Sequence, residues 1–390
     1  MTFRDILENS QQYFVELING RRNSNPDKFL KGVLFVLSRV YRRLVQFRIW
    51  AYDKRIFRPR SLGCLVVSIG NLTCGGTGKT PVVEIFARTL AHKGRKVAIL
   101  SRGYRSKDRT PAEKLMAFFK SKNKEIPPRV VSDGKNLLLN SLSAGDEPYM
   151  LASNLRDVIV LVDKDRVKSG RYAISDFEAD TLILDDGFQY LDLKPKLNIL
   201  LVDATSPFNN HHVLPRGLLR EPVKNIRRAN YIFLTKSDGS PRHRHLKKFI
   251  RQHNKKAEII ECRHKPLYLE DVFNPEIQVG LETLKGLHIA ALSGIANPHS
   301  FEEFLSKLGA EIVMSAQFAD HHRFEQQEII DFMNNAVESG AKAVITTEKD
   351  AVRIPRLDRR DIPLYFMRVE IDIISGQENF DQCISRICFL

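Results

Sequence analysis

A run of glycines followed by a lysine and a threonine stands in residues 70–81, which read GNLTCGGTGKTP. Glycines at these spacings let the backbone curl so that its N–H groups face a phosphate. Lys79 is placed to reach the β- and γ-phosphates of a nucleotide, and the Thr80 hydroxyl can bind Mg²⁺. The residues expected to hold the nucleotide are Thr73, Gly75, Gly76, Thr77, Gly78, Lys79 and Thr80. Thr73 stands where the GxxxxGK[ST] pattern has its first glycine, so a Gly-rich turn with a chance Lys-Thr pair is the alternative.

An apolar run that ends in two carboxylates follows at residues 181–189, TLILDDGFQ. A buried strand with acidic residues at its end places a carboxylate beside the Mg²⁺ of a phosphate loop. Asp185 and Asp186 are adjacent, so they point in different directions, and the sequence predicts both as metal-associated. The alternative is a strand that ends in an acidic turn.

Transfer of a phosphate to a hydroxyl also needs a group that accepts the hydroxyl proton. Three segments offer ionisable candidates: SAGDEP at residues 143–148, FADHH at 318–322 and TTEKDAVR at 346–353. A carboxylate paired with a histidine would suit this task near neutral pH. Taken alone, the spacing of each segment favours a surface turn or a helix cap over a catalytic site. A loop at residues 214–222 (LPRGLLREP) adds arginines suited either to phosphate recognition or to a solvated surface.

Composition limits the partners without choosing among them. The 390 residues carry a formal net charge of +15, which favours anionic partners such as nucleic acid, an anionic membrane or a phosphorylated substrate. The five cysteines include no CxxC pair and no His/Cys cluster with zinc spacing, which fits a reducing compartment. The first residues have no signal-peptide pattern, and no run of 18 uncharged apolar residues predicts a membrane span.

The elements that must position these groups alternate between strands and helices. Short apolar runs typical of buried parallel strands occur at residues 64–69, 96–100, 158–162, 181–184, 198–202, 231–234, 288–292 and 343–347. Helical patterns lie between them, notably at residues 81–93, 242–256, 301–308 and 326–339. This alternation predicts an α/β fold of P-loop NTPase type, with a doubly wound, mostly parallel sheet and a smaller C-terminal α/β domain.

We expect three regions: a basic N-terminal helical region at residues 1–60, a P-loop core at 61–262 and a second domain at 263–390. The first contains 13 Lys/Arg against 5 Asp/Glu. Within it, residues 29–50 form an amphipathic helix that has Leu30, Val33, Leu34, Leu37, Tyr41 and Leu44 on one face and Arg39, Arg42, Arg43 and Gln46 opposite. Such a helix can lie in a membrane interface with its basic residues on anionic headgroups, or it can dock on the domain with a solvated basic face.

Together these motifs resemble those of the tetraacyldisaccharide 4'-kinase family of lipid A biosynthesis. The matching segments begin at residues 70 (GNLTCGGTGKTP), 101 (SRGY), 145 (GDEP), 184 (LDDGFQ), 214 (LPRGLLREP), 318 (FADHH) and 346 (TTEKDAVR). They occur in the family's order across roughly residues 30 to 353. The chain departs from the family at Arg105, at Tyr190 and in an apparent insertion at residues 106–130.

The resemblance implies transfer of the γ-phosphate of Mg-ATP to the 4'-hydroxyl of an acylated glucosamine disaccharide 1-phosphate, giving lipid IVA. It implies a peripheral protein on the cytoplasmic side of a Gram-negative inner membrane, with the basic helix near the acyl chains and the 1-phosphate. Asp146 corresponds to the family's proposed catalytic base, and His321 to the histidine that raises its basicity. The resemblance also places Tyr104, Glu147, Arg220 and Glu221 near the active site.

Two other functions remain open from the sequence. One is a P-loop NTPase switch such as a metal-insertion GTPase, because residues 235–238 (TKSD) resemble a guanine-reading NKxD element with Thr in place of Asn. The other is a basic, non-enzymatic binder of nucleic acid or membrane. Nucleic acid is not expected as a partner, because aromatic residues are not interleaved with the basic ones in a stacking pattern.

Overall fold

The computed structural model describes residues 13–388 except 15, 19, 21, 105, 108–109, 111–124, 296 and 360. Arg105 and most of the predicted insertion therefore lie outside the described residues. The chain divides into two compact units. Unit 1 comprises Met1–Arg102, Asp165–Arg263 and Ile373–Leu390, and unit 2 comprises Gly103–Lys164 and His264–Asp372.

Unit 1 is built on a parallel sheet whose central strand leads into the phosphate loop. The strands lie in the order β7 (Tyr231–Thr235), β6 (Leu197–Asp203), β1 (Leu65–Asn71), β5 (Thr181–Asp185) and β2 (Val97–Ser101). Val67 of β1 is in register with Ile183 on one side and Leu197 on the other. These strands are buried almost throughout, which is why each reads as a mainly apolar run.

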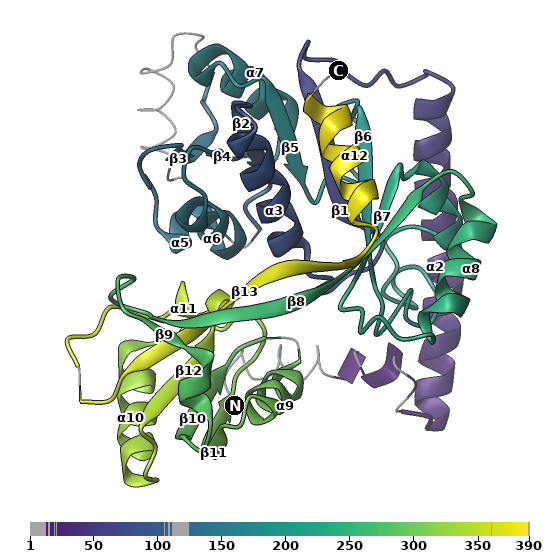
Figure 1. Cartoon of the computed structure of the whole chain (residues 1–390). Helices are drawn as coiled ribbons and strands as arrows, with labels where there is room; N and C mark the ends of the chain where they lie inside the picture. The colour runs from purple at the N-terminus through teal and green to yellow at the C-terminus, as the bar shows by residue number, and fades with distance from the viewer. Residues whose placement is uncertain are drawn as a thin grey trace. The chain divides into compact units, whose positions relative to one another are not determined.

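Helices α3 (Lys79–His92) and α12 (Gln377–Cys388) pack against each other beside this sheet (Figure 1). Their contact is aromatic: the Phe86 ring meets the Phe380 ring at 5.2 Å and the Phe233 ring at 5.5 Å between centroids. A second apolar cluster lies under α8 (His243–His253) and the 3-10 helix η1 (Val223–Arg228). Helix α7 (Arg166–Phe177) packs against β2.

The predicted basic helix is α2 (Asn25–Asp53), which begins at a capping box formed by Ser24 and Asp27. Only a narrow side of α2 docks on unit 1, through Leu34, Ser38 and Ile49. Leu30, Tyr41 and Val45 are half-buried, and nine large apolar side chains of this helix are exposed: Phe29, Val33, Phe35, Val36, Leu37, Val40, Leu44, Phe47 and Trp50. The predicted single apolar face is therefore divided between a docked side and an exposed one. Within the described residues, no helix is long and apolar enough to cross a bilayer.

Unit 2 contains a second, mainly parallel set of strands. Its order is β11 (Glu311–Gln317), β10 (His288–Ser293), β12 (Ala343–Thr347) and β13 (Leu364–Ser375), with β8 (Glu258–Asp271) next and β9 (Gln278–Gly280) antiparallel to it. Helices α9 (Pro298–Lys307) and α10 (Gln326–Glu338) pack on these strands.

Residues 103–164 form a smaller part of unit 2. They contain the antiparallel pair β3 (Arg129–Asp133) and β4 (Ile159–Val162), together with helices α5 (Ser141–Ala144) and α6 (Asp146–Asn154). Helix α6 contacts α11 (Glu348–Ala351), which follows β12 directly.

The division into units differs from the linear one expected from the sequence. The change at Arg263 and His264 falls at the expected boundary near residue 262. Residues 103–164, however, group with the second unit, and residues 373–390 return to the first. The alternating α/β fold with mostly parallel strands is confirmed.

Candidate functional site

The phosphate loop of unit 1 joins β1 to α3, as its glycines predict. Gly75 and Gly78 have φ angles of 115° and 73°, which side chains rarely tolerate. Gly78 is the N-cap of α3, so Lys79 is the first residue of the helix. The backbone N–H groups and the positive end of the helix dipole at this terminus attract an anion. Thr77 is buried, and its hydroxyl accepts a hydrogen bond from the Asn71 amide at 2.9 Å.

Residues at the ends of β6 and β7 form hydrogen bonds that hold the phosphate loop in place. The Thr235 hydroxyl donates to the carbonyl oxygen of Thr77 at 2.8 Å. The Lys236 ammonium donates to the carbonyl oxygen of Gly76 at 2.9 Å and to Asp203 Oδ2 at 2.6 Å. Burial would raise the pKa of Asp203, but the bonds from Lys236 and Thr205 outweigh it and lower that pKa. Thr235 and Lys236, interpreted from the sequence as part of a guanine reader, are thus bonded to the phosphate loop.

The carboxylate of Asp186 lies beside two cationic side chains at the phosphate loop. Its carboxylate lies 3.5 Å from the Lys79 ammonium and 2.6 Å from Arg220 Nη1. Burial raises the pKa of Asp186, but the charges of Lys79 and Arg220 outweigh this and hold the pKa below its usual value. The residue has a φ of 53°, a strained conformation that orients its side chain toward these partners.

Asp185 is the other carboxylate of the predicted metal pair. It is buried and accepts a hydrogen bond from the Ser101 hydroxyl at 2.9 Å. Among the described residues no three His, Cys, Asp or Glu side chains form a metal cluster. Mg²⁺ at a phosphate loop needs only one or two protein oxygens, because waters and phosphate oxygens supply the rest. The hydroxyl of Thr80 and the carboxylate of Asp185 fit that donor set, whereas Asp186 is already bound to two cations.

Unit 2 brings together two candidates that lie 175 positions apart in the chain. Asp146 Oδ2 lies 3.1 Å from His321 Nδ1. Asp146 opens α6 directly after Gly145, whose φ of 93° lets the chain turn sharply into the helix. His321 itself has a φ of 67°, and its backbone N–H donates to Gly294. Positive φ at a non-glycine residue of this size is uncommon and often marks functional sites.

Two arginines complete the surroundings of Asp146. Arg353 Nε donates to Oδ2 at 2.8 Å, and Arg323 Nη2 donates to Oδ1 at 3.0 Å. Burial would raise the pKa of Asp146, which is only 5% exposed. The bond from His321 and the charges of Arg353 and Arg323 outweigh burial and lower the pKa. The carboxylate is therefore ionised at neutral pH and acts only as an acceptor.

The ionised carboxylate fixes the tautomer of His321. Since Asp146 can only accept, Nδ1 of the ring donates to it, and Nε2, which faces an ammonium that can only donate, is the accepting nitrogen. Nε2 lies 3.2 Å from the Lys349 ammonium, which also binds Asp320 at 3.1 Å. The ring is thus held by one nitrogen and offers the other.

Arg353 is itself anchored, a feature that the sequence motif did not reveal. Its Nη1 donates to Asp350 Oδ1 at 3.0 Å, and both side chains are fully buried. Asp350 also accepts from the Gly294 N–H at 3.0 Å and from the Thr347 hydroxyl at 2.6 Å. The segment TTEKDAVR therefore supplies a cap, a buried carboxylate and the arginine that binds Asp146. The only signal in the sequence is the spacing of three between an acid and a base, which is common on any helix.

The other predicted residues have mixed placements. The ring of Tyr104, 63% exposed, lies 5.8 Å from the His321 ring. Glu147 lies in the first turn of α6, beside Asp146. Glu221 is buried and binds Arg228 at 2.5 Å and Asn225 at 2.8 Å, so its carboxylate is already occupied. Lys79, Thr80, Asp185, Asp186 and Arg220 belong to unit 1, whereas Tyr104, Asp146, Glu147 and His321 belong to unit 2.

Comparison with known proteins gives a consistent result across the chain. The model of the family described as Tetraacyldisaccharide-1-P 4'-kinase matches residues 30–388. The tetraacyldisaccharide 4'-kinase of Halothermothrix orenii is 33% identical, with 96% of this chain and 97% of the relative covered. That of Anaeromyxobacter sp. strain K is 40% identical, with 93% of each chain covered.

A solved structure agrees with these relatives. The "apo" form of LpxK from Aquifex aeolicus in complex with ATP superimposes with a TM-score of 0.72 at 29% identity. The match covers 92% of this chain and 99% of that one. The similarity therefore extends to both units and not to the phosphate-loop region alone.

Proposed function

Because the chain belongs to the tetraacyldisaccharide-1-P 4'-kinase family, we propose that it transfers the γ-phosphate of ATP to the 4'-hydroxyl of a tetraacyldisaccharide 1-phosphate. The product is the corresponding bisphosphorylated lipid, lipid IVA. The observation that carries this proposal is the buried Asp146–His321 pair, at 3.1 Å, in a chain that also has a phosphate loop. A P-loop switch has no acceptor hydroxyl to deprotonate, whereas a kinase does.

In this proposal unit 1 holds the nucleotide. The loop N–H groups and Lys79 bind the β- and γ-phosphates. Arg220 releases its hydrogen bonds to Asp186 and binds the transferring phosphoryl group instead. Thr80 and Asp185 would hold Mg²⁺, which when bound supplies positive charge to the phosphate oxygens. Ser101 orients Asp185 through its hydroxyl. Lys236 and Thr235 bind the carbonyl oxygens of Gly76 and Thr77, which leaves the N–H groups of the loop free to face the phosphates.

Unit 2 supplies the proton acceptor, and the geometry favours His321 over Asp146 for that role. A carboxylate whose pKa is lowered by three donors is a poor base. It is well suited to fix the ring through Nδ1 and to stabilise the imidazolium that forms when Nε2 takes the proton. The expectation from the family resemblance assigned these roles the other way round, and both residues stay essential in either assignment. Tyr104 covers the ring and Lys349 lies at Nε2, where an acceptor hydroxyl would displace it.

Helix α2 suggests where the reaction occurs. Seven exposed apolar side chains fall on one stripe of its surface: Phe29, Val33, Val36, Leu37, Val40, Leu44 and Phe47. Arginines flank this stripe, and the chain carries a net charge of +15. An apolar stripe with cationic flanks matches an anionic membrane interface. We therefore assign α2 to peripheral contact with the cytoplasmic face of the inner membrane of a Gram-negative bacterium, where ATP is available.

The GTPase alternative has less support. In a guanine reader the Lys and Asp of the NKxD element contact the base. Here Lys236 is bound to Asp203 and Gly76, and Asp238 Oδ1 accepts from the N–H of Ser240 at 2.9 Å. Both side chains thus have partners within the protein.

A transfer assay tests the proposal directly. Purified protein in neutral detergent micelles receives ATP labelled at the γ-phosphate, Mg²⁺ and tetraacyldisaccharide 1-phosphate. Label in a bisphosphorylated lipid is expected, and it should be absent with Lys79→Ala. ATP hydrolysis without labelled lipid would contradict the proposal. Membrane contact is tested separately by vesicle flotation, in which Val36→Glu/Leu44→Glu should lose binding while retaining ATP binding.

A further inference from the structure

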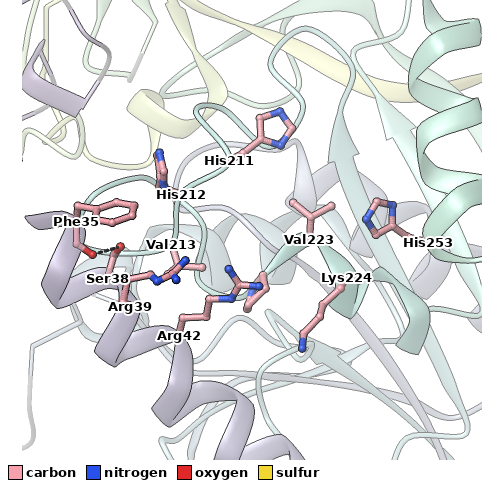
Figure 2. A pocket seen from close by; sticks show the side chains of 11 residues that line it. Phe35, Ser38, Arg39, Arg42, His211, His212, Val213, Val223, Lys224 and His253 are labelled. Carbon is pink, nitrogen blue, oxygen red and sulfur yellow. Dashed lines mark hydrogen bonds between the residues drawn. The ribbon is translucent and has the colours of Figure 1, made fainter.

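A cavity of about 370 Å³ lies beside α2 on unit 1, and none of the residues given a role in the transfer chemistry lines it (Figure 2). Four segments line it: α2, residues 211–213, residues 222–224 and the end of α8. The volume is within the range of small-ligand sites and exceeds what a single phosphate group requires.

The lining is cationic. Six of its eleven residues are basic: Arg39, Arg42, Lys224, His211, His212 and His253. None of the eleven is an Asp or Glu. Figure 2 shows Arg39 and Arg42 reaching from α2 toward the segment that carries Val223 and Lys224. This concentration of positive charge in a concave site attracts an anion.

The three fixed charges are not neutralised within the described part of the protein. No ion pair or hydrogen bond joins the side chains of Arg39, Arg42 or Lys224 to a carboxylate there, whereas Lys79, Arg220 and Lys236 at the phosphate loop each have one. Arg39 instead lies over the Phe35 ring at 5.7 Å. Cations held close together without counter-charge repel one another, and the repulsion is relieved when an anion enters.

One imidazole of the lining, that of His212, is shifted toward its neutral form. Burial lowers the pKa of His212, and the neighbouring Arg216 and His211 lower it further. A neutral ring there can donate one hydrogen bond without adding to the repulsion. The Phe35 ring packs edge-on against His212 at 5.7 Å and holds its position.

The cavity opens at the edge of the exposed apolar stripe of α2. On a 3.6-residue helix, Arg39 is about 60° around the axis from Val36, a member of the stripe, and Arg42 is a further 60° away. If the stripe enters the acyl layer, these two arginines stand at the depth of the lipid headgroups. A ligand of the cavity would therefore be attached to the membrane.

We propose that this cavity binds the phosphate monoester group of a membrane lipid. A monoester carries between one and two negative charges near pH 7 and offers three oxygens, which two guanidinium groups and an ammonium can share. A diester headgroup has one charge and two free oxygens, and satisfies fewer of these donors. The group has two sources: the 1-phosphate of the acceptor itself, or a bystander anionic lipid that aligns the protein on the surface. This inference rests on the membrane contact proposed above.

Two measurements on the full chain test whether the cavity binds a phosphate monoester. They also distinguish the acceptor's 1-phosphate from a bystander lipid as the source of that group. The first measures sedimentation with phosphatidylcholine vesicles that contain phosphatidate, a monoester, or phosphatidylglycerol, a diester, mixed to equal surface charge. The wild type should prefer the monoester about tenfold, the effect of one or two charge-assisted bonds. Arg39→Gln/Arg42→Gln should reduce that preference to less than about twofold. The matched control Lys28→Gln/Arg43→Gln removes two charges from α2 outside the cavity, so both affinities should fall equally and the preference should remain.

The second arm measures transfer to the acceptor in neutral detergent. If the acceptor's own phosphate occupies the cavity, KM for the acceptor rises about tenfold in Arg39→Gln/Arg42→Gln with kcat unchanged, and the control variant keeps the wild-type KM. If a bystander lipid occupies it, KM is unchanged and only the monoester preference is lost. The proposal is overturned when the wild type shows no monoester preference and KM is unchanged, or when the control variant matches the cavity variant in both arms. Absence of transfer by the wild type would instead contradict the kinase proposal, and vesicle binding does not depend on it.

Discussion

Asp146 Oδ2 and His321 Nδ1 lie 3.1 Å apart, although the residues are separated by 175 positions in the chain. The two come from the start of a helix and from a tight turn, and Arg323 and Arg353 hold the carboxylate in place from its other sides. This contact decides which nitrogen of the ring is free, and so which group can take a proton.

The first prediction separates the roles of the two residues. His321→Gln should lower kcat by about 10²–10⁴ and abolish the acid limb of the pH–rate profile, because the group that must be deprotonated is gone. Asp146→Asn should also lower kcat but retain an acid limb, because the imidazole remains. Steady-state kinetics between pH 5 and 9 measure both, with ATP binding as the control. An acid limb that persists in His321→Gln and disappears in Asp146→Asn would return the role of base to Asp146.

Lys236 should affect ATP more than the acceptor. Lys236→Met frees the Gly76 carbonyl and leaves the Asp203 carboxylate uncompensated beside the phosphate loop. We expect KM for ATP to rise about tenfold, with kcat changed less than about threefold. Lys96→Met is the matched control, because Lys96 pairs with the exposed Glu178 away from the loop. An unchanged affinity for ATP would show that Lys236 does not support the loop.

Arg353 should be a stability residue as well as a partner of Asp146. Arg353→Met leaves two buried carboxylates, Asp146 and Asp350, without their shared cation. Removal of one partner from a buried ion pair costs about 3–5 kcal/mol, so the free energy of unfolding should fall by that order. Urea unfolding measures it, with Arg242→Met, which breaks an exposed pair with Asp238, as the control that should behave as wild type. A loss no larger than that of the control would contradict this account.

Acid stability should depend on Asp146. Its pKa is lowered in the folded protein, whereas an unfolded Asp titrates near about 3.9. The stabilisation is therefore fully present above the unfolded pKa and is lost as pH falls through the lower folded value, because the unfolded state binds the proton first. Unfolding midpoints should fall more steeply below about pH 4 in the wild type than in Asp146→Asn. Equal slopes would mean that the group does not contribute.

Gly145 should be required for the entry into α6. Its φ is 93°, and an added Cβ would lie 3.1 Å from the Tyr104 carbonyl oxygen. Gly145→Ala should cost about 1–3 kcal/mol of stability and reduce kcat, since Asp146 is the next residue. The control Gly32→Ala meets no atom within 4 Å and lies inside α2, so it should stabilise by about 0.5–1 kcal/mol. Thermal unfolding of both variants would show whether the two substitutions differ in sign.

The sequence was sufficient for the parts of the fold in which burial is complete. Strand β1, which leads into the loop of Lys79, and strand β5, which ends at Asp185, are mainly apolar and buried almost throughout, and the loop glycines have one structural use, so both motifs could be located directly. Strands β8 and β13 were not predicted, because their residues alternate irregularly between buried and half-exposed. Helix α2 was predicted, but the division of its apolar face depends on what packs against it.

The site was harder to predict where it depends on long-range packing. The motifs marked Asp146 and His321 separately, and only the fold shows that they meet. Arg353 and Asp350 were part of a noted segment, yet an acid and a base at a spacing of three do not indicate burial. Lys236 was considered for base recognition only in the alternative GTPase hypothesis, because its chain neighbours resemble that pattern, whereas its ammonium reaches Asp203, 33 positions away. The discontinuous units have no local signal at all.

Helix α12 contributes Phe380 to the aromatic cluster that fixes α3, the helix that begins at Lys79. A ribosome therefore finishes the phosphate loop about three hundred residues before it makes the segment that holds the helix of that loop in place. A nascent chain that ends before Gln377 presents Phe86 without this cover. Unit 1 therefore gains the Phe380 part of this cluster only after residues 377–388 have been synthesised.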